Sequence, residues 1–392
     1  MFNVLCLNKI AREGIAELPP RSFSFSEGMP PNGILVRSAP LLDMPLNPEL
    51  LAIARAGAGV NNIPVARCSE AGIAVFNTPG ANANAVKELT IAGLLLSSRR
   101  IVEGINWIRG ASLSAEEVES GKERFAGPEL AGKKIGVVGL GAVGVLVANA
   151  CDALGMNVTG YDPYVTVEAA WSLSRGVKRA RGEGDVMAGS DYVTLHVPLN
   201  DSTKGFVGER VLSLMKKGAR LLNFSRGGVV DDAAVIAALK SGRLSRYVTD
   251  FPSTAFAGVD GVLAMPHLGA STPEAEVNCA VAAARRLRDY MENGCVKNSV
   301  NLPDCDMGAV NGMTRITVFN RNVPNVVGPI TSALAAAGAN IAHMLNRSKG
   351  EYAYNIIDVD GPLPLATLRE IEGLAGVIRA RLLNNPTGGD AK

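Results

Sequence analysis

Three glycines near the middle of the chain have the spacing of a dinucleotide-binding turn. Gly139, Gly141 and Gly144 form a GxGxxG motif between a mostly β-branched run, residues 135–138, and an apolar stretch, residues 145–154. In a strand–turn–helix unit, the first glycine makes the tight turn, the second lets the backbone approach a pyrophosphate, and the third lets helix and strand pack closely. The free N–H groups and the dipole of the helix N-terminus favour the anion. The motif alone is weak evidence, so its surroundings must decide its meaning.

A carboxylate stands where such a unit needs one. A second expected strand, residues 157–161, ends at Asp162. The family of dinucleotide-binding turns places an acidic residue roughly 20 residues after the glycines, where it accepts hydrogen bonds from the ribose hydroxyls. An acid at this position repels the 2′-phosphate of NADP. Strand, glycines, helix and acid together predict an NAD site, with a turn that binds nothing as the less favoured alternative.

Two side chains have the chemistry to act beside a nicotinamide. His267 follows the expected strand 261–265, and Arg226 follows another strand that begins at residue 219. A histidine is a good general acid/base at neutral pH. An arginine binds a carboxylate through two parallel hydrogen bonds and polarises a carbonyl. With NAD, the pair predicts hydride transfer between a 2-hydroxy acid and a 2-keto acid; the alternative is that both residues are structural.

The other two histidines are expected to have other roles. His196 lies inside the apolar strand 192–199, so a core or cofactor-edge histidine is the favoured interpretation. His343 lies in the C-terminal part of the chain, away from the nucleotide-binding unit.

Composition excludes several classes of function. The chain has 392 residues, 47% of them hydrophobic and 19% charged, which predicts two or three domains with large cores. A net charge of +2 argues against binding to nucleic acid or to a membrane surface. The six cysteines lack CxxC spacing, which predicts free thiols in a reducing cytoplasm and no metal site. Neither a signal peptide nor a membrane-spanning stretch is expected.

The first part of the chain is expected to deliver further polar residues to one edge of a sheet. Strands over 33–36 and 73–76 precede Arg37 and Asn77, and Gly59 follows a third apolar run. In open α/β sheets, ligands bind beyond the carboxyl ends of the strands. These residues should therefore lie together, although a solvated surface arginine is an equally weighted alternative for Arg37.

The order of elements predicts an α/β protein with two doubly wound parallel sheets and a C-terminal βαββαβ, ferredoxin-like unit. A helix over 85–104 is expected to cross from the first part to the second, and a capped helix over 271–293 to return. The predicted boundaries are a substrate-binding domain over 1–97 and 273–303, a nucleotide-binding domain over 98–272, a linker over 304–313, the C-terminal domain over 314–384, and a disordered tail over 385–392.

The chain resembles the D-2-hydroxyacid dehydrogenases, and in particular their phosphoglycerate dehydrogenase branch with a C-terminal ACT domain. The resemblance lies in the glycine motif and in residues 36–38, 56–63, 77–89, 161–164, 223–228 and 266–272. It implies NAD-dependent oxidation of 3-phosphoglycerate to 3-phosphohydroxypyruvate, the first step of serine biosynthesis, in the cytoplasm.

The resemblance also implies roles for individual residues. Arg226 would bind the substrate carboxylate and carbonyl, and His267 would be the acid/base. The substrate pocket would contain Arg37, Ser38, Ala58, Gly59 and Asn82, with Arg37 suited to the phosphate. The NAD site would be formed by the three glycines and by Ala142, Val143, Asp162, Val197, Pro198, Phe224, Ser225, Arg226, Asp250, His267 and Gly269.

One position departs from the family pattern. The family usually has a Glu four or five residues after the position of Asp250, where it pairs with the catalytic histidine. This chain has Thr254 and Ala255 there. The departure leaves two alternatives beside phosphoglycerate oxidation: reduction of another 2-keto acid such as glyoxylate, and an NAD-binding sensor with weakened catalysis.

The C-terminal unit resembles an ACT domain that senses a small molecule. Asn320, Asn322 and Asn340 match its ligand-binding positions, and an L-serine effector at a subunit interface of a homodimer or homotetramer is expected. A His that is often found at the position of Asn320 is absent, and a purely structural dimerisation domain is the alternative.

Overall fold

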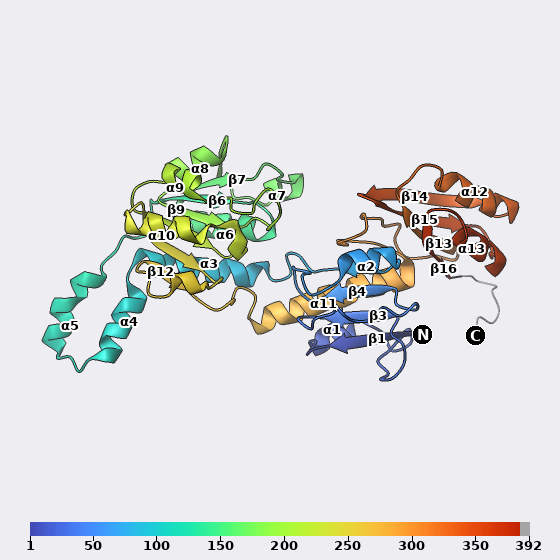
Figure 1. Ribbon diagram of the computed structural model, residues 1–392, viewed down its shortest axis with the longest axis horizontal. Coiled ribbons are helices and arrows are strands. Elements are labelled where there is room, and N and C mark those ends of the chain that lie inside the picture. Colours follow the sequence, from blue (N-terminus) through green and yellow to red (C-terminus); the bar gives the residue numbers. More distant parts are fainter. Residues whose placement is uncertain (385–392) are drawn as a thin grey trace. The chain divides into compact units, whose positions relative to one another are not determined.

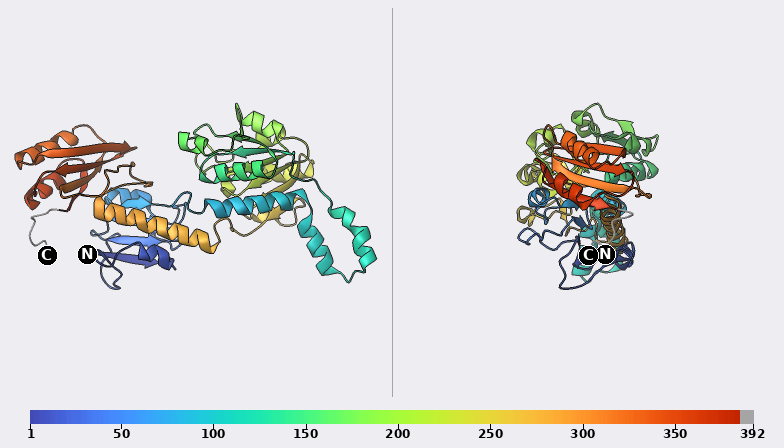
Figure 2. Two further views of the ribbon diagram at one scale, coloured as in Figure 1. Left: turned by 180° about the vertical axis from the view of Figure 1, so that it is seen from behind. Right: turned by 90° about the vertical axis from the view of Figure 1, so that its right-hand side faces the viewer.

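The computed structural model describes residues 1–384, so the tail expected to be disordered lies outside the described residues. The chain divides into two compact units, Asn82–Ala275 and a second one made of Met1–Ala81 with the chain from Glu276 onward (Figures 1 and 2). The C-terminal sheet thus groups with the N-terminal sheet, and the division between units falls at Asn82 and Glu276. Among residues 1–384, no helix has the length and apolar character needed to span a membrane.

The unit Asn82–Ala275 contains a seven-stranded parallel sheet in the order β12-β11-β10-β9-β6-β7-β8. The strands are β6 (Lys134–Val138), β7 (Asn157–Tyr161), β8 (Lys178–Arg179), β9 (Tyr192–Leu195), β10 (Ala219–Asn223), β11 (Leu244–Thr249) and β12 (Val262–Ala264). Helices α3 (Ala83–Ser98) and α6 (Ala142–Ala153) cover one face, and α8 (Glu183–Gly189), α9 (Glu209–Leu214) and α10 (Asp232–Lys240) cover the other. A short helix, α7 (Val167–Trp171), follows β7.

Alternating side chains explain why helices cover both faces of this sheet. In β6, Val137 packs in the core under α3 and α6, whereas Val138 packs in the core under the other three helices. A parallel strand buried on both faces reads as a continuous apolar run, as β6 does. The doubly wound fold predicted for this part of the chain is confirmed, and its strand order reverses between β6 and β9.

The helix predicted over 85–104 is wrong in its extent. Helix α3 ends at Ser98 because Arg99 is extended, and a second helix, α4 (Ile101–Gly110), begins after it. Helices α4 and α5 (Ala115–Gly121), with the 3-10 turn η1 (Lys122–Phe125), form a helical arm that extends away from the seven-stranded sheet (Figure 1). Neither helix of the arm has a buried residue, and Trp107 packs on Phe125 with ring centroids 5.3 Å apart.

The other unit contains a five-stranded parallel sheet in the order β2-β1-β3-β4-β5. Its strands are β1 (Phe2–Leu7), β2 (Phe23–Ser24), β3 (Gly33–Val36), β4 (Ala52–Arg55) and β5 (Ala74–Phe76). Helices α1 (Arg12–Ala16) and α11 (Pro273–Asn293) contribute to the core on one face, and α2 (Val65–Glu70) contributes to the other. The returning helix was predicted correctly, including its cap: the Thr272 hydroxyl accepts the backbone N–H of Ala275 at 3.1 Å.

The C-terminal sheet is antiparallel in the order β14-β15-β13-β16. Its elements are β13 (Thr314–Arg321), α12 (Val327–Ala336), β14 (Ile341–Lys349), β15 (Tyr352–Val359), α13 (Leu365–Glu372) and β16 (Val377–Leu383), which confirms the predicted βαββαβ order. Ile316 and Val318 face the core under the two helices, whereas Phe319 faces the core that contains the end of α11.

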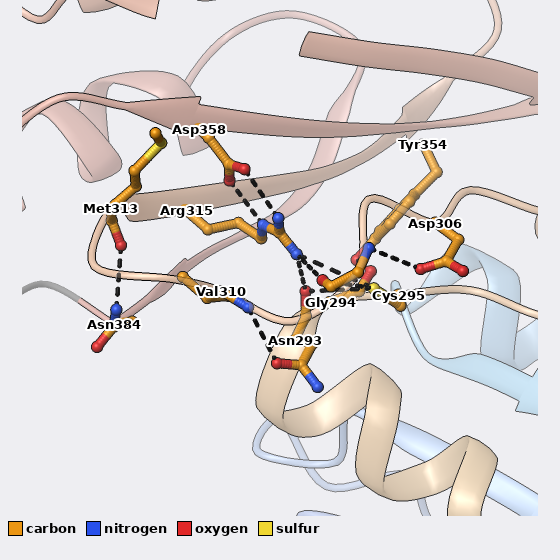
Figure 3. Close-up of polar contacts among 11 residues, drawn as sticks. Asn293, Gly294, Cys295, Asp306, Val310, Met313, Arg315, Tyr354, Asp358 and Asn384 are labelled. Carbon is orange, nitrogen blue, oxygen red and sulfur yellow. Dashed lines mark hydrogen bonds and ion pairs between the residues drawn. The ribbon is translucent and has the colours of Figure 1, made fainter. Parts of the chain in front are cut away.

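A buried arginine joins this sheet to the end of α11 (Figure 3). Arg315, on β13, has only 1% of its surface exposed and donates from Nε and Nη2 to the two carboxylate oxygens of Asp358, at 2.6 and 2.8 Å. Its Nη1 donates to the carbonyl oxygens of Asn293, the last residue of α11, and of Gly308, at 2.9 and 2.7 Å. The positive charge is therefore paired and hydrogen-bonded, as a buried charge must be.

Candidate active site

The glycine turn has the open space that a pyrophosphate needs. A Cβ at Gly139, whose φ is +90°, would lie 2.5 Å from the carbonyl oxygen of His196, and a Cβ at Gly144 would overlap the carbonyl oxygen of Gly139. A Cβ at Gly141 would meet nothing within 4 Å. Gly141 is the N-cap of α6 and supplies no side-chain cap, so the first N–H groups of this helix remain available to an anion. The second glycine of the motif thus faces an open cradle, whereas the other two are needed for packing.

Asp162 is held at the edge of the same turn. Its Oδ2 accepts the backbone N–H of Leu140 at 2.8 Å, and its Oδ1 accepts that of Tyr164 at 2.8 Å. A carboxylate has about four lone-pair sites, so both oxygens can still accept ribose hydroxyls. The turn and the acid fit the adenosine half of NAD.

Asp250 carries a buried oxygen without a partner. It follows β11, is 1% exposed, and its Oδ2 accepts the N–H of Gly269 at 2.9 Å. Its Oδ1 is buried and has no hydrogen-bond partner among the described residues. The pKa of Asp250 is raised, because the effect of burial exceeds the opposing effects of the Gly269 N–H and of the neighbouring His267 and Arg226. An orphaned buried acceptor of this kind fits a polar group of a bound cofactor.

His267 follows β12 and lines a cavity of about 680 Å³. Its ring lies 4.7 Å from that of Phe251, centroid to centroid. Within the described residues, no carboxylate forms a hydrogen bond or ion pair with the imidazole. The positions of the family Glu, Thr254 and Ala255, belong to the 3-10 turn η3 (Thr254–Phe256).

The cavity beside His267 contains two carboxylates that the sequence did not reveal, Asp231 and Asp232. Asp250, Asp231 and Asp232 line it together with His267. Asp231 is the N-cap of α10 and accepts the N–H of Ala234 at 3.0 Å. Asp232, in the first turn of α10, has no partner among the described side chains.

Arg226 is positioned by the residue that ends β10. The buried side chain of Asn223 donates to the carbonyl oxygen of Arg226 at 2.9 Å and accepts the Ser225 hydroxyl at 2.7 Å. The Arg226 guanidinium donates from Nη1 to the carbonyl oxygen of Ser225 at 2.6 Å, which leaves its other N–H groups available to a carboxylate. Arg226, Asp250 and His267 follow β10, β11 and β12, which are neighbours in one parallel sheet.

His196 is unsuited to proton transfer at neutral pH. Burial lowers the pKa of His196 to about 3, and its Nε2 lies 3.0 Å from the Thr194 hydroxyl. Val197 and Pro198 follow it at the carboxyl end of β9, and Phe224, at the end of β10, is buried.

Four of the residues predicted for the substrate follow the carboxyl ends of β3 and β4 in the other unit: Arg37, Ser38, Ala58 and Gly59. Arg55 ties two of these segments together, since its guanidinium donates to the carbonyl oxygens of Arg37, at 2.8 Å, and of Gly59. The side chain of Asn8 accepts the N–H of Ser38 at 2.9 Å. Sequence patterns gave no signal for these roles of Arg55 and Asn8.

Two further contacts involve the segments that follow β3 and β4. Arg37 forms an ion pair with Glu276 on α11, with 2.7 Å between Nη1 and Oε1. Asn77 donates to the carbonyl oxygen of Ala58 at 2.6 Å. Asn82, the N-cap of α3, belongs to the unit that holds Arg226 and His267.

The three asparagines predicted to bind an effector lie at two ends of the C-terminal sheet. Asn320 is 2% exposed, and its amide is hydrogen-bonded to Asn355 and to the carbonyl oxygen of Arg321. Asn322 donates to the carbonyl oxygen of Gly350 at 3.0 Å, next to the turn between β14 and β15. Asn340 comes directly before β14, at the opposite end of the sheet, and its side-chain amide donates to the Asp360 carboxylate at 2.7 Å.

Comparison with known proteins agrees with this geometry. Residues 91–269 match the family described as D-isomer specific 2-hydroxyacid dehydrogenase, NAD binding domain. The D-3-phosphoglycerate dehydrogenase of Escherichia coli K12 is 33% identical over 348 residues, which cover 86% of this chain and 82% of that protein. That of Methanocaldococcus jannaschii is 36% identical over 262 residues, 65% of this chain and 48% of that protein, so the match spans about half of this archaeal relative.

Solved structures show the same fold. A glyoxylate reductase from Paecilomyes thermophila is 25% identical with a TM-score of 0.64, over 76% of this chain and 98% of that one. An NAD+-bound 3-phosphoglycerate dehydrogenase from Entamoeba histolytica has a TM-score of 0.59 at 24% identity, over 76% of this chain and 98% of that one. The chain contains the NAD-binding domain of these enzymes, and it belongs to the D-isomer specific 2-hydroxyacid dehydrogenase family.

Proposed function

We propose that this protein oxidises 3-phospho-D-glycerate to 3-phosphohydroxypyruvate with NAD, the first step of L-serine biosynthesis. The observation that carries the proposal is the placement of Arg226, Asp250 and His267 at the ends of three adjacent strands of the NAD-binding sheet. The names of the curated relatives support the choice of substrate.

The residues of this chain account for the steps of such an oxidation. Arg226 binds the substrate carboxylate through parallel hydrogen bonds and orients the carbon that carries the hydroxyl. His267 takes the hydroxyl proton on an imidazole nitrogen as the carbonyl forms, and becomes imidazolium. NAD, when bound, supplies the hydride acceptor.

Arg37 is proposed to bind the substrate phosphate. It follows β3 at the edge where the Gly59 segment also lies, and Arg55 holds the two segments together. An arginine matches the geometry of a phosphate through paired N–H groups. Glu276 occupies one side of the guanidinium and would have to share it.

The test is NADH formation with 3-phosphoglycerate, followed by absorbance, against D-glycerate and D-lactate. The expected result is a kcat/KM at least tenfold higher for the phosphorylated acid, because one charge-assisted contact stabilises binding by about 1.5–3 kcal/mol. No NADH from any of the three acids, with NAD binding retained, would instead favour the NAD-binding sensor.

Reduction of glyoxylate is a second candidate. One support is the similarity to the glyoxylate reductase of Paecilomyes thermophila. The other is the Arg37–Glu276 ion pair, in which the carboxylate offsets the positive charge that would bind a phosphate. NADH consumption with glyoxylate in place of 3-phosphohydroxypyruvate separates the two. A higher kcat/KM with glyoxylate would replace the proposed substrate.

We further propose a homodimer or homotetramer that binds L-serine, in the cytoplasm. In the sheet register, Arg321 pairs with Tyr352 and Ile341 pairs with Val359, so Asn322 and Asn340 of one chain lie at opposite ends of the sheet. A ligand held by both residues therefore needs two copies of the chain. The apolar side chains Ile105 and Ile108, both exposed on the α4 arm, suit a contact between copies.

Light scattering on the purified chain and calorimetry with L-serine test these two proposals. If light scattering shows a monomer and calorimetry detects no heat of binding at millimolar serine, the C-terminal sheet is a structural domain without this effector.

A further inference from the structure

A cavity of about 630 Å³ lies within the unit that contains both termini of the described chain, apart from the residues assigned above to catalysis. Three segments form its walls: the loop after β5, with Asn77 and Pro79; the connection after α11, residues 298–304; and the end of β14, with Ser348 and Lys349. The cavity thus lies where the C-terminal sheet meets the N-terminal one.

The walls present one positive and one negative group with unused hydrogen-bonding capacity. Lys349 donates from Nζ to the carbonyl oxygen of Ser299 at 2.8 Å, which uses one of its three N–H bonds. Asp304 accepts the backbone N–H of Asn298 on Oδ1 at 2.7 Å. Its Oδ2 has no hydrogen-bond partner among residues 1–384.

Neutral polar groups complete the lining. The side-chain amide of Asn298 and the hydroxyl of Ser348 both line the cavity and have no partner in the described part of the chain. Asn298 is held at a φ of +54°, a conformation that fixes the direction in which its side chain leaves the backbone. Pro79 and Pro303 supply apolar surface.

A second cation lies behind this lining. Arg286, on α11, donates to the carbonyl oxygen of Asn77 and is attracted electrostatically by Asp304. A lone cation in the cavity would therefore meet Lys349 and Arg286, and a lone anion would meet Asp304. A molecule that carries both charges a short distance apart satisfies both walls.

We propose that this cavity binds a zwitterionic α-amino acid. Lys349 and Asn298 hold its carboxylate, and Asp304 holds its ammonium group. Charge-assisted hydrogen bonds at both ends give the site its selectivity against molecules with a single charge.

The position of the cavity connects such a ligand to the substrate edge. The Ser299 hydroxyl donates to the carbonyl oxygen of Val75 at 2.9 Å, and Ser299 forms an isolated β-bridge with Phe76, so the wall of the cavity is attached to β5. A carboxylate that competes for Lys349 weakens the contact between Lys349 and Ser299. Any effect on the KM for 3-phosphoglycerate rests on the proposed function, whereas binding itself does not.

Calorimetry on the full chain without NAD or substrate tests binding. The probes are glycine, L-serine, L-leucine and L-glutamate, with propionate and ethylamine as the singly charged comparisons. An Asn340→Ala background separates this cavity from the serine site proposed on the C-terminal sheet. We expect at least one amino acid to bind about tenfold or more tightly than either singly charged probe.

Two variants and one control assign that binding to the cavity. Lys349→Gln and Asp304→Asn should each weaken binding about tenfold or more, whereas Lys240→Gln, on the exposed side of α10, should not change it. Asp304→Asn keeps an oxygen that can accept the Asn298 N–H, so the fold is retained, and circular dichroism checks this. Absence of binding by all four amino acids, or equal binding by both variants and the control, overturns the proposal even if phosphoglycerate oxidation is found. Binding without phosphoglycerate oxidation leaves the site in place and refutes the proposed function alone.

Discussion

The Arg37 guanidinium and the Glu276 carboxylate are 2.7 Å apart, and each side chain is about two-fifths exposed. Arg37 follows β3, and Glu276 lies near the start of α11, so residues far apart in the sequence share one ion pair. A phosphate that binds Arg37 has to compete with this carboxylate. If Arg37 binds the substrate phosphate as proposed, this pair should set how strongly the protein discriminates between a phosphorylated and an unphosphorylated acid.

Replacing Arg37 and replacing Glu276 should change the selectivity for the phosphorylated acid in opposite directions. Arg37→Ala should raise the KM for 3-phosphoglycerate about tenfold or more, because a charge-assisted contact is lost, with little change for D-glycerate. Glu276→Gln should lower the KM for 3-phosphoglycerate, because the guanidinium is freed from a competing charge. Steady-state kinetics with both acids measures this. An unchanged KM in Arg37→Ala would move the phosphate site elsewhere, and Lys87, a basic residue in the first turns of α3, is the next candidate.

Asp162 should set the preference for NAD over NADP. Because its two oxygens also accept backbone N–H groups, Asp162→Ala removes both the charge and the support of the glycine turn. Asp162→Asn removes the charge but keeps one of the two acceptor oxygens, so it should narrow the ratio of kcat/KM values for NAD and NADP about tenfold while retaining more of the turn than Asp162→Ala does. Asp43→Asn, on an exposed loop, is the control. Equal use of both cofactors by the unmodified protein would contradict the assignment.

A carboxylate restored beside His267 should increase the rate of oxidation. His267 must be neutral to take the hydroxyl proton, so kcat/KM falls at low pH as the imidazole becomes protonated. A Glu nearby stabilises the imidazolium, and Ala255→Glu should therefore raise kcat and move the acid limb of the pH profile to higher pH. Thr254→Glu tests the neighbouring position in the 3-10 turn.

Ala255→Gln is the matched control, since it adds the same bulk without charge and should leave the acid limb in place. If neither Glu variant shifts the limb or the rate, then a group already present orients His267. Asp250, Asp231 and Asp232 line the same cavity and are the carboxylates to replace next, each with Asn.

The buried pair of Arg315 and Asp358 should contribute strongly to stability. Arg315→Met leaves the Asp358 carboxylate buried without its partner, and should lower the free energy of unfolding by about 3–5 kcal/mol. Arg321→Gln, on the same strand, breaks an exposed pair with Glu351 and should cost less than about 1 kcal/mol. Urea unfolding followed by circular dichroism compares them. Equal urea midpoints for the two variants would show that the buried pair contributes no more to the free energy of unfolding than the exposed pair does.

The sequence by itself determined the features that depend on local chemistry. The glycine turn, Asp162, the helix with its Thr272 cap and the βαββαβ order follow from spacing and periodicity over a few residues. The alignment of Arg226, Asp250 and His267 at one edge also follows from the sequence, because the carboxyl ends of parallel strands share an edge.

Only the tertiary structure decided the contacts that join distant segments. Nothing near Arg37 in the sequence points to Glu276, and nothing near His267 points to Asp232, because these pairs arise when a helix packs beside the end of a strand. The end of α3 at Ser98 was missed since no Gly or Pro marks it; the Ser98 hydroxyl instead donates to the carbonyl oxygen of Leu94 and contacts Tyr192, a strand residue. Packing between segments, which local patterns do not encode, placed Glu276 beside Arg37 and placed Lys349 and Asp304 in the walls of one cavity.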